Sequence, residues 1–121
     1  MTLKNFQLAK WYTRIIAILF LLVFFSFLFD YFTFGFRLET GHKLFHVLIG
    51  GIILAVGWSN SRFWLFFPLV NGLFFIGVAT WGFIFPNFLG LAAFNFTDTI
   101  LHSIVGITGV GVSLGFERWI S

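Results

Sequence analysis

The sequence predicts an all-α protein of four membrane-spanning helices, and three observations carry this prediction. Of the 121 residues, 60% are hydrophobic and only 9% are charged, whereas a soluble domain carries about 25% charged residues. The apolar residues gather in four long runs, and a helix needs about 20 such residues to cross a bilayer. Short turns separate the runs, so neighbouring helices are expected to be antiparallel. This composition excludes a water-soluble domain and a disordered chain.

The expected spans lie within a single domain, residues 1–121, and cover about residues 12–34, 40–58, 63–85 and 97–117. The apolar run of the first span, residues 15–29, follows the basic residue Arg14, and no small-residue cleavage site comes after it. A retained helix is therefore expected rather than a signal peptide. Asp30 lies about 24 Å beyond Arg14 at about 1.5 Å per residue. We therefore expect Asp30 at the far edge of the hydrocarbon, in an exposed pair with Arg37 or Lys43.

The three later spans each carry a feature that fits a membrane helix. The second carries polar residues near its start, including His42, Lys43 and His46, and is apolar after them. The third has Pro68 one turn inside its start, where proline is tolerated. It also contains Asn71, which is expected to bond a neighbouring helix or backbone. The fourth is bounded by Asp98 and Glu117.

The basic residues predict the orientation. Five of the seven would share one side with both termini: Lys4, Lys10, Arg14, Arg62 and Arg118. Because cytoplasmic ends are enriched in Lys and Arg, both termini are expected in the cytoplasm, in a bacterial-type plasma membrane. Aromatic residues agree, since interfacial belts are rich in Trp and Tyr. Those expected at the cytoplasmic edge are Trp11, Tyr12, Trp58, Trp64 and Trp119, with Tyr31 and Trp81 toward the outer edge.

Two segments of the chain resemble each other. Each has a histidine, a glycine four residues later and a polar residue four residues earlier. The matching residues are His42, His46 and Gly50 in the second span, and Asp98, His102 and Gly106 in the fourth. We therefore expect a 2+2 internal repeat, in which two hairpins are related by a pseudo-two-fold axis along the membrane normal.

The same segments carry a family resemblance. The run from Asn95 to His102 reads Asn-x-x-Asp-x-x-Leu-His and is followed by Gly106, while Leu44, His46 and Gly50 match on the second span. This pattern resembles that of a family of small four-helix bacterial membrane proteins of unknown function. The resemblance implies the four-helix fold and a membrane location, and it carries no assigned activity.

The candidate functional residues form a polar cluster expected between helices: His42, His46, Asp98 and His102. Spacing of i to i+4 places each pair on one helical face. The first interpretation is structural: a hydrogen-bond network in which His46 and His102 bridge helices and Asp98 orients His102. A proton-transfer or transport role is a further alternative.

Two other interpretations of this cluster involve a cofactor. A divalent metal ion could be held by three histidines and an aspartate in a tetrahedral shell, although Lys43 places a cation nearby. A b-type haem could take His46 and His102 as axial ligands, with Gly50 and Gly106 leaving room for the ring. Against haem, small residues on these helices are explained more simply by helix packing. Our leading expectation is therefore no cofactor.

The sequence favours a protein that is not an enzyme. It has no recognisable Ser-His-Asp set, phosphate loop or paired catalytic carboxylates, and without cysteine it has no thiolate site. We expect an accessory, interaction or structural membrane component, and the alternative is an electron-transfer protein that holds haem or metal through His46 and His102. Expected partners are the lipid bilayer and either further copies or a larger membrane complex, and no nucleic acid. The glycines expected to pack helices are Gly50, Gly106, Gly111 and Gly115.

Overall fold

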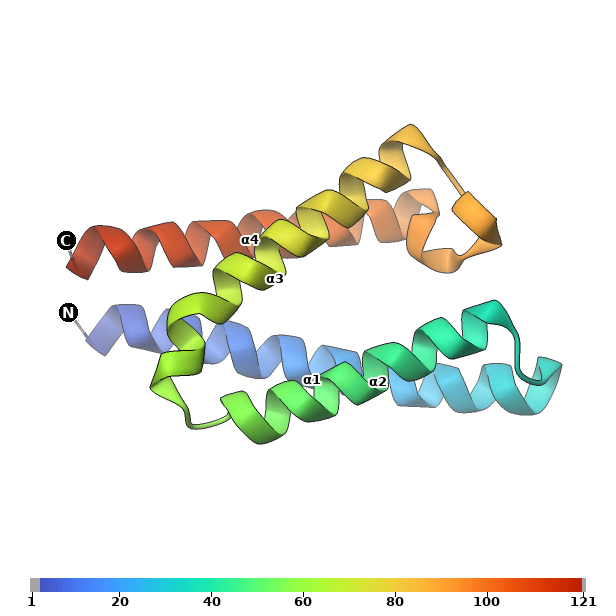
Figure 1. Cartoon of the computed structure of the whole chain (residues 1–121), viewed down its shortest axis with the longest axis horizontal. Helices are drawn as coiled ribbons and strands as arrows, with labels where there is room; N and C mark the ends of the chain where they lie inside the picture. The colour runs from blue at the N-terminus through green and yellow to red at the C-terminus, as the bar shows by residue number, and fades with distance from the viewer. Residues whose placement is uncertain (1–2, 121) are drawn as a thin grey trace.

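The structure is a computed structural model that describes residues 3–120, with the side chains of residues 7–115. The elements are α1 (Leu3–Phe34), α2 (Leu38–Gly57), α3 (Ser61–Ile84), two short 3-10 turns, η1 (Phe88–Gly90) and η2 (Ala92–Phe94), and α4 (Phe96–Ile120) (Figure 1). The all-α prediction is confirmed, and the helix ends agree closely with the expected spans, except that α1 already begins at Leu3. Lys4, Arg118 and Trp119 lie outside the residues whose side chains are described.

All four helices are long and apolar enough to cross a membrane, over Gln7–Phe34, Leu38–Gly57, Ser61–Ile84 and Phe96–Gly115. Their outer faces carry large apolar side chains, such as Phe32, Val70 and Ile107, which are 78%, 58% and 65% exposed. Soluble monomers rarely expose apolar patches of more than a few hundred Å². This exterior is that of a protein surrounded by lipid.

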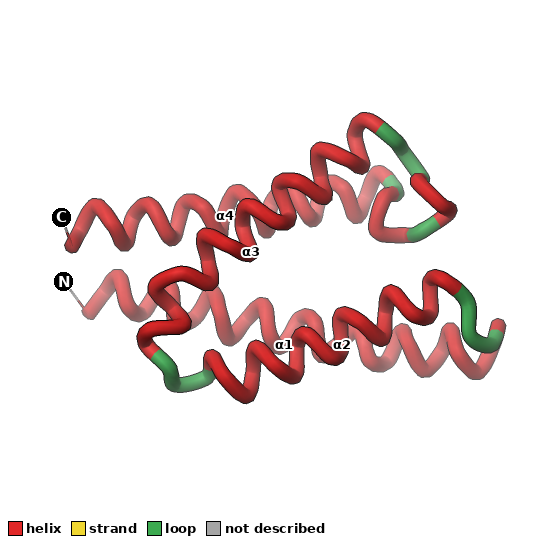
Figure 2. Tube along the Cα trace, in the orientation of Figure 1, coloured by secondary structure: helices red, strands yellow, loops and turns green. Residues whose placement is uncertain are grey.

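The helices form two antiparallel hairpins. Helix α1 packs mainly on α2, and α3 packs mainly on α4, while α1 makes smaller contacts with both helices of the second hairpin. The start of α1 and the end of α4 lie at one end of the bundle (Figure 1). The α2–α3 turn lies at this same end, and the other two turns lie at the opposite end, as the green segments of Figure 2 show.

Glycines bring the helix backbones together inside each hairpin. A Cβ atom on Gly72 of α3 would lie 2.7 Å from the backbone nitrogen of Val110, and one on Gly106 of α4 would lie 2.8 Å from that of Ile76. In the first hairpin, a Cβ on Gly50 would lie 2.8 Å from Cβ of Phe20. These three sites have no room for a side chain, so close approach there depends on glycine.

Gly111 and Gly115 behave differently from the other glycines of α4. At both positions an added Cβ would find no atom of the described residues within 4 Å. The two glycines therefore make no close helix contact within the part of the chain that the structure describes.

A buried polar contact joins the two hairpins near the end that carries the termini. The side-chain amide of Asn71 on α3 donates to the Tyr12 hydroxyl of α1 at 2.9 Å. That hydroxyl donates to the backbone carbonyl of Val105 on α4 at 3.1 Å. The expected role of Asn71 is confirmed. Tyr12 is only 7% exposed and belongs to the core with Ile16, so it packs between helices and does not face the bilayer.

Asp30 is buried, which corrects the expectation of an exposed ion pair. Its carboxylate is 3% exposed and accepts hydrogen bonds from Arg37 and from the Thr40 hydroxyl. The Lys43 ammonium lies 3.8 Å from the same carboxylate. Thr40, itself fully buried, covers Asp30 at the start of α2. The estimate of about 0–1 kcal/mol for an exposed pair therefore does not apply to this site.

A matched pair of glycine substitutions on α3 tests the packing. We expect Gly72→Ala to lower the free energy of unfolding by about 1–3 kcal/mol, because the new methyl group meets backbone that cannot move aside. Gly77 is the control, because an added Cβ there meets nothing within 4 Å. Unfolding by SDS in mixed micelles measures both variants. Equal stability of Gly72→Ala and Gly77→Ala would contradict the close helix contact.

Candidate functional site

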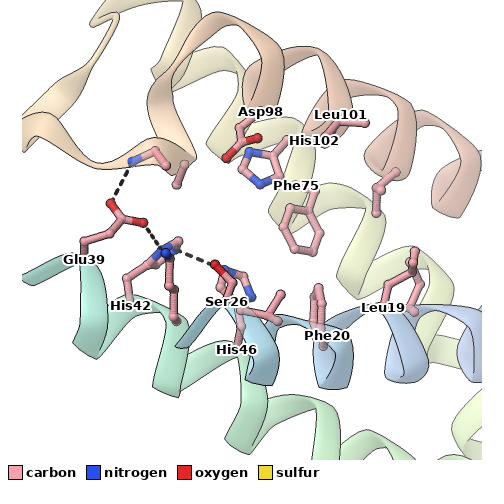
Figure 3. A pocket seen from close by; sticks show the side chains of 16 residues that line it. Leu19, Phe20, Ser26, Glu39, His42, His46, Phe75, Asp98, Leu101 and His102 are labelled. Atoms are coloured by element: carbon pink, nitrogen blue, oxygen red, sulfur yellow. Dashed lines mark hydrogen bonds and ion pairs between the residues drawn. The ribbon is translucent and has the colours of Figure 1, made fainter. Parts of the chain in front are cut away.

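The hairpins separate at the end away from the termini, and a cavity of about 470 Å³ lies between them there (Figure 3). Residues of both hairpins and of η2 line the cavity, and most of its wall is apolar. Its polar lining comprises Ser26, Glu39, His42, Lys43, His46, Asp98 and His102. The structure thus brings the four candidate residues to one cavity, two from each hairpin. Pockets of about 300–1,000 Å³ with apolar walls and a few polar groups are typical ligand sites.

The two histidines of α2 form a pair on one helical face, as their spacing predicts. Nε2 of His42 lies 3.0 Å from Nε2 of His46, and the two rings meet edge to face with centroids 4.5 Å apart. A hydrogen bond between these nitrogens requires one ring to carry the proton on Nε2 and the other to accept it. If both rings instead carry their proton on Nδ1, the lone pairs of the two Nε2 atoms converge on one point.

Glu39 completes this arrangement, and it is not among the site residues predicted from the sequence. One of its carboxylate oxygens, Oε2, accepts the backbone N–H of Ala92 in η2 at 2.8 Å. The other, Oε1, lies 3.9 Å from Nδ1 of His42. Glu39 thus connects α2 to the α3–α4 turn and also faces the histidine pair. The available signal was its position three residues before His42, which places both side chains on one face of the helix.

His102 is linked to the histidine pair by aromatic contacts. Its ring stacks on Phe75 of α3 with centroids 5.1 Å apart, and Phe75 lies 5.8 Å from Phe20 of α1. Phe20 in turn meets His46 edge to face at 5.0 Å. This row of rings crosses the cavity wall from one hairpin to the other.

The expected hydrogen bonds of the fourth helix do not appear in the part of the chain that the structure describes. The ring atom Nδ1 of His102 is buried and has no hydrogen-bond partner there. Asp98 lies beside His102 in Figure 3. Its backbone N–H is bonded to the Asn95 side chain at 2.7 Å, which caps α4. His102 therefore stacks on an aromatic ring of α3. The interhelical hydrogen bond predicted from the sequence is not seen among the described residues.

The site has hydrogen-bonding capacity that the chain itself does not use. Nδ1 of His42, like Nδ1 of His102, is buried without a partner among the described residues. A buried unpaired polar atom costs about 1–3 kcal/mol. Two residues that line one cavity thus each keep a ring nitrogen that the described part of the chain leaves unsatisfied.

The side-chain positions also bear on the two cofactors considered from the sequence. Within residues 7–115, no group of three or more histidine and acidic side chains is placed to hold a metal ion as it stands. Axial ligation of haem by His46 would have to break the Nε2 contact with His42. Among the described side chains, the histidine pair of α2 is the one set of possible ligands that already lies together.

A comparison with protein families, curated proteins and solved structures finds no match to the chain. The geometry of the cavity therefore carries the functional argument. The resemblance to the small four-helix membrane family remains a prediction from the sequence.

Substitutions of Glu39 test whether it holds the α3–α4 turn. We expect Glu39→Ala to speed hydrogen exchange at the Ala92 amide at least about tenfold, because a hydrogen bond to a charged group is worth about 1.5–3 kcal/mol. Glu39→Gln is the matched control, since its side-chain carbonyl can still accept the bond. Hydrogen exchange read by mass spectrometry measures both. Unchanged exchange in Glu39→Ala would show that the turn is held by other contacts.

Proposed function

We propose that the chain is a multi-pass protein of a bacterial-type plasma membrane that acts by binding rather than by catalysis, as an accessory or interaction component. The observation that carries the proposal is the cavity of about 470 Å³ between the hairpins. Its wall is mostly apolar, and two imidazole nitrogens of its lining residues have no hydrogen-bond partner among the described residues. These are features of a site that receives a ligand or a partner group.

The lining of the cavity supports a non-catalytic role. Ser26 is the one hydroxyl side chain that lines it, and the described residues show no hydrogen bond between Ser26 and a histidine. Nucleophilic catalysis needs such a nucleophile within hydrogen-bond reach of its base. The histidine pair faces Glu39, an arrangement that orients the rings without activating a nucleophile.

The proposal includes the orientation and the internal repeat. The end of the bundle that carries the termini also holds Lys10, Arg14 and Arg62, which supports a cytoplasmic location for that end. The paired glycines support the repeat, because Gly50 makes a close helix contact in the first hairpin and Gly106 makes one in the second. Membership of the small four-helix family would follow from the same pattern.

The proposed partners are other copies of the chain or a larger membrane complex. Gly111 and Gly115 support this part of the proposal, because they lie four residues apart on α4 and are not used in close contacts within the described chain. Small residues at this spacing let helices of separate chains approach closely. A haem-binding electron-transfer role has less support, because Nε2 of His46 already faces His42.

A blocked cavity tests the binding function. We expect the protein, purified in mild detergent, to carry a bound mass in native mass spectrometry. Val23→Trp should lose this mass, because Val23 lines the cavity and a larger side chain there fills it. Val70→Trp is the control, since Val70 is 58% exposed on α3 and does not line the cavity. Equal occupancy of the two variants, or no bound mass in the parent protein, would contradict the proposal.

Reporter fusions test the orientation. Alkaline phosphatase needs an oxidising compartment to form its disulfides, so a fusion after Gly35 in the α1–α2 turn is expected to be active. A fusion after Ser121 is expected to be inactive, because that end is proposed to be cytoplasmic. The reverse pattern of activities would show that the chain has the opposite orientation.

A further inference from the structure

We propose that the cavity binds a divalent transition-metal cation of the Zn²⁺ class, with His42 and His46 as its first ligands and Asp98 and His102 as its ligands from α4. The inference names the ligand of the site described above and rests on the binding function proposed for it. It also explains why four groups able to ligate a metal line one cavity whose wall is mostly apolar.

The histidine pair of α2 already has nearly the required geometry. Zinc binds imidazole nitrogen at about 2.0–2.1 Å in tetrahedral sites, so two such ligands lie about 3.3 Å apart. Nε2 of His42 and Nε2 of His46 are 3.0 Å apart. A shift of a few tenths of an ångström would therefore place both lone pairs on one ion.

Glu39 supplies the outer partner that a ligating histidine usually has. Such a histidine commonly donates its second ring N–H to a carboxylate, which fixes the ring and raises its basicity. Nδ1 of His42 has no hydrogen-bond partner among the described residues, and Oε1 of Glu39 lies 3.9 Å from it. The Ala92 amide holds the other oxygen of this carboxylate. Coordination at Nε2 would leave the proton on Nδ1, facing Glu39.

The remaining ligands come from the opposite wall. Asp98 and His102 have the same i to i+4 spacing on α4 and lie across the cavity from the histidine pair (Figure 3). Together the four side chains would form a tetrahedral set of three nitrogens and one oxygen. Because the described side chains do not yet lie close enough to share an ion, binding requires the two hairpins to approach each other across the cavity.

The charges around the cavity favour a cation. Two carboxylates, Glu39 and Asp98, line it against one ammonium group, that of Lys43. The Lys43 ammonium lies 3.8 Å from the Asp30 carboxylate. The negative charge of Asp30 therefore already offsets part of the positive charge of Lys43. An anionic ligand would meet two carboxylates in a low-dielectric site. Nitrogen ligands favour zinc and its neighbours over Mg²⁺ and Ca²⁺, which prefer oxygen.

Calorimetric titration of the full chain in detergent with ZnCl₂, after treatment with a chelator, tests the proposal. We expect one ion per chain, with Ca²⁺ and Mg²⁺ failing to compete. His42→Gln and His46→Gln should each weaken binding at least about 100-fold, and Glu39→Gln about 10–100-fold, the range found for outer partners of metal ligands. Thr108→Ala, an exposed position on α4 outside the cavity, should bind as the parent does. All three histidines of the chain line this cavity, so histidine-dependent binding reports on this site.

A distance measurement tests the ligands from α4 without relying on loss of binding. The chain has no cysteine, so spin labels can be placed at Leu38→Cys and Phe96→Cys, which are exposed at the starts of α2 and α4. We expect Zn²⁺ to shorten the distance between the labels, and His102→Gln to abolish the shortening. An unchanged distance on Zn²⁺ binding would overturn the assignment of Asp98 and His102 as ligands.

The results distinguish an absent metal site from an absent binding function, which the metal site presupposes. Failure of the parent protein to bind Zn²⁺ would overturn the metal site. If native mass spectrometry then still shows an organic molecule whose binding Val23→Trp abolishes, the binding function stands with another ligand. If neither an ion nor a molecule occupies the cavity, both proposals are wrong.

Discussion

Hydrocarbon offers no hydrogen bonds, and the polar contacts of this bundle follow from that constraint. An unsatisfied backbone or side-chain group within a bilayer costs several kcal/mol, so buried polar residues need partners. The hydroxyl of Thr13 bonds a carbonyl of its own helix, whereas other polar residues take their partner from a second element. Tyr12 meets Asn71 where α1 crosses α3. Asp30 meets Thr40 where α2 begins. Arg14 donates to the carbonyl of Trp58 just past the end of α2, where backbone oxygens lack helical partners. Each contact of this second kind therefore marks a junction between elements.

The junctions are distributed unevenly, and the cavity is the consequence. Toward the end with the termini, the Tyr12 hydroxyl joins α1 to both α3 and α4. At the opposite end, one hydrogen bond links the described parts of the two hairpins, from the Ala92 backbone to Glu39. Within each hairpin the helices approach closely at glycines such as Gly50 and Gly72. Two stiff hairpins that are joined firmly near one end leave space between them at the other.

The sequence predicts the helices of this fold well and their lateral contacts poorly. Apolar runs and short turns are local signals, and they determined the four spans. The spacing of His42 and His46 is also local, and the pair forms as predicted. The partner of Tyr12 is 59 residues away, so the sequence shows only an aromatic residue near a membrane edge. The burial of Asp30 depends on how the start of α2 folds back over α1, which spacing alone does not reveal.

The two halves of the internal sequence similarity are not equivalent in the structure, and the difference bears on how the site could work. His42 and His46 are held by polar contacts, to each other and toward Glu39, which is anchored by the backbone of η2. The corresponding histidine of α4, His102, stacks on Phe75 with ring centroids 5.1 Å apart. Aromatic pairs are worth about 0.5–1.5 kcal/mol beyond their buried area, and offset stacks tolerate sliding. Helix α2 therefore presents a pair of nitrogens held by polar contacts, whereas the α4 ring rests on an aromatic stack.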